Sequence, residues 1–102
     1  RPLLANLAAG RLGGARAGEL AEEAVEVEVS LQLNIAHASL KLEKWSATIE
    51  AASEVLERRP GNEKALYRRG VAYARLGRKD DAVADFQELL QQGPNAAAER
   101  EL

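Results

Sequence analysis

The sequence contains no cysteine and a single histidine, which excludes disulfides and an ordinary zinc site. It has eight glycines, three prolines and only four aromatic residues, all of them between positions 45 and 86. No apolar run approaches the ~18 residues that a membrane-spanning helix needs. The chain begins at Arg1 and has no methionine, so we interpret it as a fragment of a longer protein in which no targeting signal can be judged.

What the chain does contain favours closely packed helices. Alanine and leucine together make up roughly a third of the sequence, and both lose little side-chain entropy in a helix. A length of 102 residues corresponds to one domain or less. The positions of the aromatic residues predict that the dense core lies in the second half. A net charge of −2 gives no global support for a nucleic-acid partner.

The segment 25–33 alternates strictly between apolar and polar residues, which by itself indicates a strand. The flanking stretches 19–24 and 34–42 contain no Gly or Pro and are rich in helix formers. The apolar residues also share one helical face, at Val25, Val29, Leu33, Ala36 and Leu40. Because a strand would find no partner strand elsewhere in the chain, we favour one helix over about 19–42.

Capping and turn residues predict the remaining elements. Four glycines in 10–18 predict a loop or linker, and 2–9 is expected to form at most a short helix. Ser46 and Asn62 are suitable N-caps, and Gly77 is suitable as a left-handed stop. The expected helices are about 46–59, 62–76, 79–92 and a last one that starts near residue 95.

Segments of the chain repeat at a fixed offset of about 34 residues, a length that is found among helical repeat proteins. Identical residues recur at this offset, in the pairs Ala38/Ala72, Leu42/Leu76, Glu54/Glu88, Leu56/Leu90 and Pro60/Pro94. Small residues also correspond where two helices must approach closely, as for Ala36 and Gly70. A helix–turn–helix unit of this length that ends in Pro is typical of the tetratricopeptide repeat (TPR).

The strings LNIAHASLKLEKW and NEKALYRRGVAYARLG, between Leu33 and Gly77, closely resemble the TPR domains of FKBP-type immunophilin co-chaperones. The resemblance implies an all-α fold, a short right-handed α-solenoid. We expect two TPR units at about 29–62 and 63–95 within 28–95. Residues 1–27 would be a remnant of a preceding repeat or a linker, and 96–102 the start of a C-terminal capping helix. Because the family places its prolyl-isomerase fold before three TPRs, any isomerase activity would lie outside this chain.

The first helix of each TPR pair lines a groove, which makes its side chains candidates for binding. In the helix 62–76, three cations lie within ~40° of one another and share one stripe, with Tyr67 beside it: Lys64, Arg68 and Arg75. Arg69 points about 140° from Lys64 and is expected to reach solvent. Asn34, His37 and Lys41 share a stripe on the preceding helix. The stretch 64–79 holds six cations and no acid, which favours an acidic partner.

By the same resemblance, Asn34, Lys64 and Arg68 correspond to three residues of the family's carboxylate clamp. The implied ligand is the acidic C-terminal tail of heat-shock protein 90 or heat-shock protein 70, and the implied location is cytoplasmic. A Lys and an Asn from one further repeat upstream would complete the clamp. We therefore expect this chain alone to bind the tail weakly.

Other interpretations remain open beside this one. The same cations form an ordinary solvated face if no ligand exists, and Tyr67 either packs or contacts ligand. The aromatic residues Trp45, Tyr73 and Phe86 are expected to pack between helices. A structural TPR stack that packs on another domain, or self-associates through its incomplete first repeat, is the main alternative. Nucleic-acid binding by the short cationic stripe is weaker still, because the chain is acidic.

Catalysis has little support in the sequence. His37 lies in the middle of a predicted helix, and the only aspartates are 80, 81 and 85, so no Ser–His–acid triad is suggested. The glycine spacing fits neither a dinucleotide fingerprint nor a P-loop. We therefore expect no enzyme activity, no cofactor and no metal in this chain.

Overall fold

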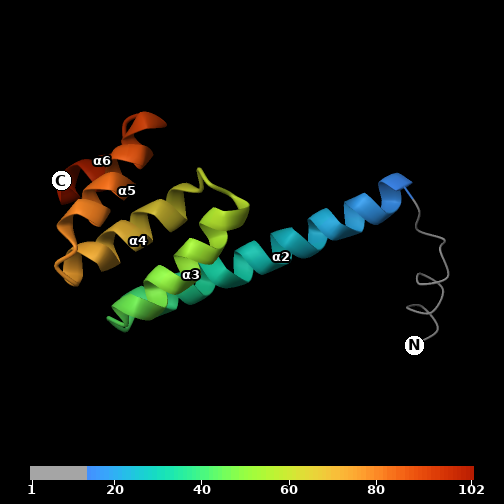
Figure 1. Ribbon diagram of the computed structural model, residues 1–102, viewed down its shortest axis with the longest axis horizontal. Coiled ribbons are helices and arrows are strands. Elements are labelled where there is room, and N and C mark those ends of the chain that lie inside the picture. Colours follow the sequence, from blue (N-terminus) through green and yellow to red (C-terminus); the bar gives the residue numbers. More distant parts are fainter. Residues whose placement is uncertain (1–13) are drawn as a thin grey trace.

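The computed structural model describes the backbone of residues 14–102 and the side chains of residues 18–102, so the short helix expected over 2–9 lies outside the described residues. Across 14–102 the chain forms helices joined by short turns, which confirms the all-α fold (Figure 1). The helices are α2 (Gly14–Lys41), α3 (Trp45–Arg58), α4 (Glu63–Arg75), α5 (Lys79–Gln91) and α6 (Ala96–Glu101). None of these helices is both long and apolar enough to cross a membrane.

The alternating segment 25–33 lies inside α2, which confirms the helix and not the strand. The helix begins at Gly14, so the loop predicted over 10–18 is wrong for its described part, 14–18. The glycines there each cost ~1 kcal/mol of helix propensity, but the alanines among and after them are the best helix formers. Once nucleated, a helix gains one backbone hydrogen bond for every residue that it adds, and this extends α2 through the glycines.

Ion pairs fix the long N-terminal arm of α2 to the end of α3. Arg59 binds Glu22 at 2.6 Å and also binds Glu26, while Arg58 binds Glu28 at 2.6 Å. Beyond these contacts the first turns of α2 project away from the other helices (Figure 1). The molecule is elongated as a result, with extents of 52 × 29 × 18 Å.

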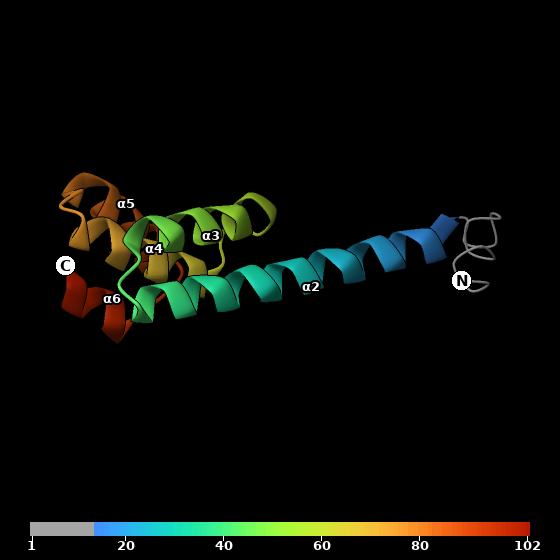
Figure 2. The same ribbon diagram turned by 90° about the horizontal axis from the view of Figure 1, so that it is seen from below.

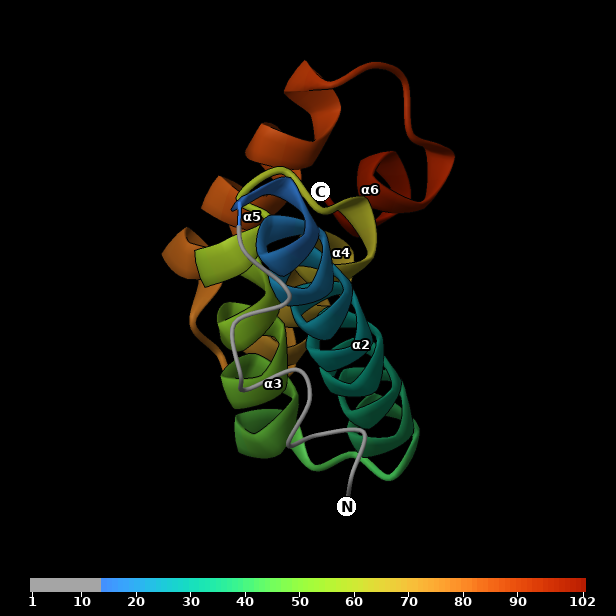
Figure 3. The ribbon, with the colours of Figure 1, turned by 90° about the vertical axis from the view of Figure 1, so that its right-hand side faces the viewer.

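Consecutive helices pack on one another in pairs, α2 on α3 and α4 on α5, and α3 also packs on α4. Figure 2 shows α3 and α5 along one side of the molecule and α2 and α6 along the other, and the end-on view of Figure 3 agrees. Helix α2 also contacts α4 directly. The two first helices of the predicted repeats are therefore neighbours.

Equivalent positions of the two helix pairs supply the core. Val55 and Leu89 correspond to each other in the repeat and both are 1% exposed, and the small residues Ala36 and Gly70 are both buried. Leu56 packs against both core clusters and joins them. The largest fully buried side chains all lie between 48 and 89, as the aromatic distribution predicts: Phe86, Leu89, Val55 and Thr48.

Of the two predicted helix caps, Asn62 is confirmed and Ser46 is wrong, and Asn95 caps the last helix in addition. The side chains of Asn62 and Asn95 accept hydrogen bonds from the backbone N–H groups of Ala65 (2.9 Å) and Ala98 (3.0 Å). Ser46 is not the cap of α3, because the helix begins one residue earlier and Lys44 occupies the N-cap position. The N–H of Lys44 also closes the turn after α2, so α3 starts directly behind that turn.

Helices α2 and α4 end in the same backbone motif. The N–H of Lys44 donates to the carbonyl of Ser39 and that of Arg78 to Tyr73, both at 2.8 Å. This six-residue closure needs a residue with positive φ just after the helix. Gly77 supplies it at φ +83, whereas the equivalent residue of the first pair is Glu43 at φ +59. The first turn is therefore strained where the second is not.

Replacing that acidic residue tests this strain. The variant Glu43→Gly is expected to be more stable than wild type by roughly 0.5–1 kcal/mol. A residue with a Cβ costs ~1–2 kcal/mol in the left-handed conformation, and glycine removes that cost. Part of the gain is lost because glycine also raises the conformational entropy of the unfolded chain. Urea unfolding followed by circular dichroism measures the change. Gly77→Glu is the matched variant and is expected to lose stability, so a loss in both variants would contradict a strained turn at Glu43.

Candidate functional site

The candidate binding residues lie on α2 and α4, the two first helices that contact each other. On α2, Asn34, His37 and Lys41 are exposed, as expected for one solvent-facing stripe. On α4, Lys64 and Arg75 of the cationic stripe are exposed, while Arg68 and the adjacent Tyr67 are half-buried. The long cationic side chains therefore stay accessible at both ends of α4.

Arg68 connects the two helices. Its Nη1 donates a hydrogen bond of 2.9 Å to the backbone carbonyl of Leu33, the residue directly before Asn34. Burial between the helices lowers the pKa of the guanidinium from its ordinary value, although the group remains a cation. A guanidinium has five N–H donors and this contact uses one. Because this bond fixes the guanidinium, the remaining donors have less rotamer freedom to lose.

Tyr67 packs inside the protein and has a polar contact at its outer end. Its ring lies 6.0 Å from that of Phe86 in a tilted arrangement, and its hydroxyl contacts Glu101 of α6 at 3.5 Å. Burial, and next the carboxylate of Glu101, raises the pKa of Tyr67. The packing role is confirmed, and contact with a ligand stays a prediction.

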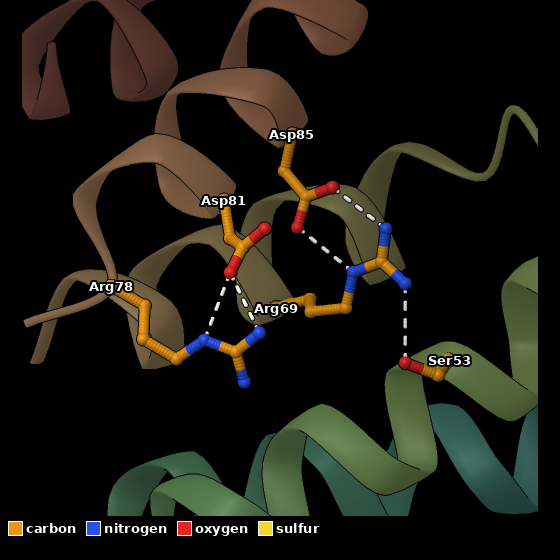
Figure 4. A network of polar contacts seen from close by, with 5 residues as sticks. All are labelled: Ser53, Arg69, Arg78, Asp81 and Asp85. Atoms are coloured by element: carbon orange, nitrogen blue, oxygen red, sulfur yellow. Dashed lines mark hydrogen bonds and ion pairs between the residues drawn. The ribbon is translucent and has the colours of Figure 1, made fainter. Parts of the chain in front are cut away.

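Arg69 is half-buried, with its side chain 23% exposed, and it is held in an ion pair, so it does not point freely into solvent as expected. Its Nε and Nη2 donate to the two oxygens of Asp85 at 2.8 and 2.7 Å, and its Nη1 donates to the hydroxyl of Ser53 at 3.1 Å (Figure 4). The side chain of Asp85 is only 6% exposed. The hydrogen bonds to Asp85 raise the pKa of Arg69. This network joins α3, α4 and α5 at one point.

A second ion pair uses another cation of the 64–79 stretch. Arg78 binds Asp81 at 2.7 Å (Figure 4), and its guanidinium lies 4.7 Å from the centre of the Tyr73 ring. Arg69 approaches the same ring at 5.7 Å, which adds a cation–π contact to the packing of Tyr73. Two of the six cations are thus neutralised by aspartates of α5. The local excess of positive charge is smaller than the sequence suggests.

The sequence contains one signal for the Arg69–Asp85 pair, the position of Asp85. Asp85 lies on the same face of α5 as Ala82, Phe86 and Leu89, all of which are buried. An acid at a core position of an amphipathic helix requires a cationic partner, because a buried charge without one is costly. Of the aromatic residues expected to pack, Phe86 is buried, Tyr73 packs against the same core cluster and Trp45 is half-buried.

Known proteins resemble the chain over the same region. The chain is 44% identical over 85 residues to Peptidyl-prolyl cis-trans isomerase FKBP4 of Bos taurus, and 45% identical over 73 residues to FK506-binding protein-like of Homo sapiens. It is 42% identical over 69 residues to Peptidyl-prolyl cis-trans isomerase PASTICCINO1 of Arabidopsis thaliana. These matches cover 82%, 71% and 68% of this chain but only 18%, 21% and 11% of the relatives.

The family model described as "Tetratricopeptide repeat" matches residues 33–97. These residues include α3, α4 and α5, the end of α2 from residue 33 onward and the first residues of α6. The resemblance to the TPR region of FKBP-type immunophilins is thereby confirmed. Because the match covers more than half of the sequence, this chain belongs to the tetratricopeptide repeat family.

Proposed function

We propose that this chain is a peptide-binding module that holds the acidic C-terminal tail of a heat-shock chaperone, heat-shock protein 90 or 70, in the cytoplasm. Its two repeats would span about 29–62 and 63–95, with 1–27 as a remnant or linker and 96–102 as the start of a capping helix. Any isomerase activity would belong to another part of a longer protein. The single observation that carries the proposal is the contact between Arg68 and the Leu33 carbonyl.

That contact supports recognition of a terminal carboxylate. A carboxylate prefers two parallel N–H donors from a guanidinium, and a donor that is already held in place loses less entropy on binding. Lys64 lies one helical turn before Arg68 and is exposed, so it supplies a second, mobile charge. Asn34 can donate through its side-chain amide. Together they provide donors of three kinds toward one anionic group.

The adjacent exposed side chains suit the rest of an acidic peptide. His37 and Lys41 continue the stripe of Asn34 along α2, and Arg75 continues that of Lys64 along α4. The ion pairs of Arg69 and Arg78 remove these two residues from the set of ligand contacts. The proposed binding residues are therefore Asn34, Lys64, Arg68, His37, Lys41, Tyr67 and Arg75.

A peptide titration tests this function. The peptide Met-Glu-Glu-Val-Asp is expected to bind saturably and weakly, and the same peptide with an amidated C-terminus is expected to lose most of the binding. Lys64→Ala and Arg68→Ala are each expected to weaken binding by roughly 10-fold or more, because a hydrogen bond to a charged group is worth ~1.5–3 kcal/mol. Isothermal titration calorimetry at two salt concentrations measures both effects.

A matched variant controls for general electrostatics. Lys79→Ala removes an exposed cation at the first turn of α5 that belongs to neither the α2 nor the α4 stripe, and it is expected to leave the affinity unchanged. Circular dichroism of Arg68→Ala confirms that losing the bond to Leu33 leaves the helices folded. Equal affinity for the free and amidated peptides would rule out a groove that recognises the terminal carboxylate.

A further inference from the structure

Helix α4 contacts a different helix on each side of its cationic stripe. On one side, Arg68 donates a hydrogen bond to the Leu33 carbonyl of α2. On the other side, the hydroxyl of Tyr67 contacts the carboxylate of Glu101 in α6 at 3.5 Å. Helices α2 and α6 lie along the same side of the molecule (Figure 2). The proposed binding stripe of α4 therefore lies between a contact to α2 and a contact to α6.

The angles of the side chains around α4 agree with this order. At 100° per residue, Lys64 and Arg75 lie within about 20° of each other, and Arg68 lies about 40° from Lys64 on the side of α2. Tyr67 lies about 60° from Lys64 in the opposite direction, on the side of α6. A peptide held along the cations is thus flanked by Tyr67 and by the carboxylate at its hydroxyl.

The local structure of α6 explains why Glu101 faces Tyr67. Asn95 caps this helix by accepting a hydrogen bond of 3.0 Å from the backbone N–H of Ala98. Ala98 is fully buried, in the core cluster against which Tyr67 packs. Glu101 follows Ala98 by three residues, so the two are neighbours on the helix surface. Burial of Ala98 therefore directs the carboxylate of Glu101 toward the outer end of Tyr67.

The charge of Glu101 acts on the same space as the cations of the stripe. Burial is the main cause of the raised pKa of Tyr67, and the carboxylate of Glu101 is the next. The cations of Arg100 and Arg75 act on the same hydroxyl in the opposite direction, each more weakly than Glu101 does. Because Arg75 is one of the proposed binding residues, a peptide beside it also experiences the negative charge of Glu101.

We propose that Glu101 is a specificity-determining residue of the peptide site, because its carboxylate repels acidic peptide side chains on the α6 side of α4. The opposite side presents the exposed cation of Lys41 on α2. Acidic side chains of the ligand are thereby confined to the side of α2. This inference rests on the proposed function and adds to it where the bound peptide carries its charge.

Two peptides with the same terminal carboxylate measure this effect, Met-Glu-Glu-Val-Asp and Met-Gln-Gln-Val-Asp. Glu101→Gln is expected to bind the Glu-containing peptide roughly twofold to fivefold more tightly than wild type does, the size of an interaction between partly exposed charges. Its affinity for the Gln-containing peptide is expected to equal that of wild type. High salt should reduce the gain, since screening weakens the repulsion that the variant removes. Isothermal titration calorimetry measures all four affinities.

Glu99→Gln is the matched control for this experiment. Glu99 is an exposed acid of the same helix, about 160° away from Glu101, so its removal is expected to leave both affinities unchanged. An equal gain for both peptides, or the same gain in Glu99→Gln, would overturn the role of Glu101. So would wild-type binding that Glu101→Gln leaves unaltered for the Glu-containing peptide. A wild type that binds neither peptide would contradict the proposed function itself, and this role with it.

A titration of the tyrosines tests the contact without any peptide. The chain has two tyrosines, Tyr67 and Tyr73, and the variant Tyr67→Phe identifies which ultraviolet signal belongs to Tyr67. Glu101→Gln is expected to lower the pKa of Tyr67, because a nearby negative charge disfavours the phenolate. Glu99→Gln is expected to leave that pKa as it is in wild type. An unchanged pKa in Glu101→Gln would place the carboxylate away from Tyr67 and overturn the proposal.

Discussion

Replacing Phe86 with Ala is expected to lower the free energy of unfolding by about 3–5 kcal/mol, a large part of the total stability of a chain of this size. Phe86 is 1% exposed, and its ring fills the space between α4 and α5 against Gly70 and Tyr67. The thermal midpoint should fall by more than about 10 °C, measured by circular dichroism. Val83→Ala on the exposed side of the same helix should change stability by less than ~0.5 kcal/mol.

Gly70 gives this prediction a sharper form. A Cβ at this position would lie 2.7 Å from a ring carbon of Phe86, closer than real atoms approach. Gly70→Ala is therefore expected to destabilise wild type, although Ala favours a helix by ~1 kcal/mol. In the Phe86→Ala background the same change should stabilise, because the ring is gone. Equal effects in both backgrounds would show that Gly70 and Phe86 do not contact each other.

Replacing Arg69 with Leu is expected to cost about 3–5 kcal/mol, because it leaves the carboxylate of Asp85 buried without a counter-charge. The comparison variant is Arg58→Leu, which breaks an ion pair whose two side chains are 44% and 47% exposed. That change should cost less than ~1 kcal/mol. Urea unfolding measures both, and similar losses would mean that burial does not distinguish the two pairs.

The double variant Arg69→Leu with Asp85→Leu distinguishes the attraction between the two charges from the cost of burying one charge alone. Removing both charges should be much less harmful than removing Arg69 alone, since no unpaired group stays buried. The coupling free energy between the two sites is then large and favourable. If the two losses simply add, the network in Figure 4 contributes nothing beyond its separate side chains.

The helices and their packing partners could be predicted from local patterns. Period, caps and the repeat offset depend on residues close in sequence, and these place α3, α4 and α5 within one or two residues. The same offset predicts that Ala36 and Gly70 are buried where helices meet. The sequence also identifies the candidate residues Asn34, Lys64 and Arg68. Two observations point to them, the resemblance to a known family and their positions on stripes of two predicted helices.

Other features depend on distances that the sequence does not contain. The glycine content of 10–18 predicts a loop, whereas helix propagation starts α2 at Gly14 and the ion pairs to Arg59 support its first half. The angle of Arg69 on α4, taken alone, predicts that its side chain lies in solvent. The tertiary structure places Asp85 of the neighbouring helix there and supplies its partner.

The sequence by itself determined which segments are helical, how they repeat and which residues carry charge, because helix geometry relates each residue to its near neighbours. Only the tertiary structure decided which charged side chains form ion pairs or contacts within the protein and which stay accessible. Arg69 binds the buried Asp85 of α5, Arg78 binds Asp81 at the surface, and Arg68 binds the backbone of α2, whereas Lys64 and Arg75 stay exposed. The physical reason is that ion pairing and burial depend on contacts between helices far apart in the chain.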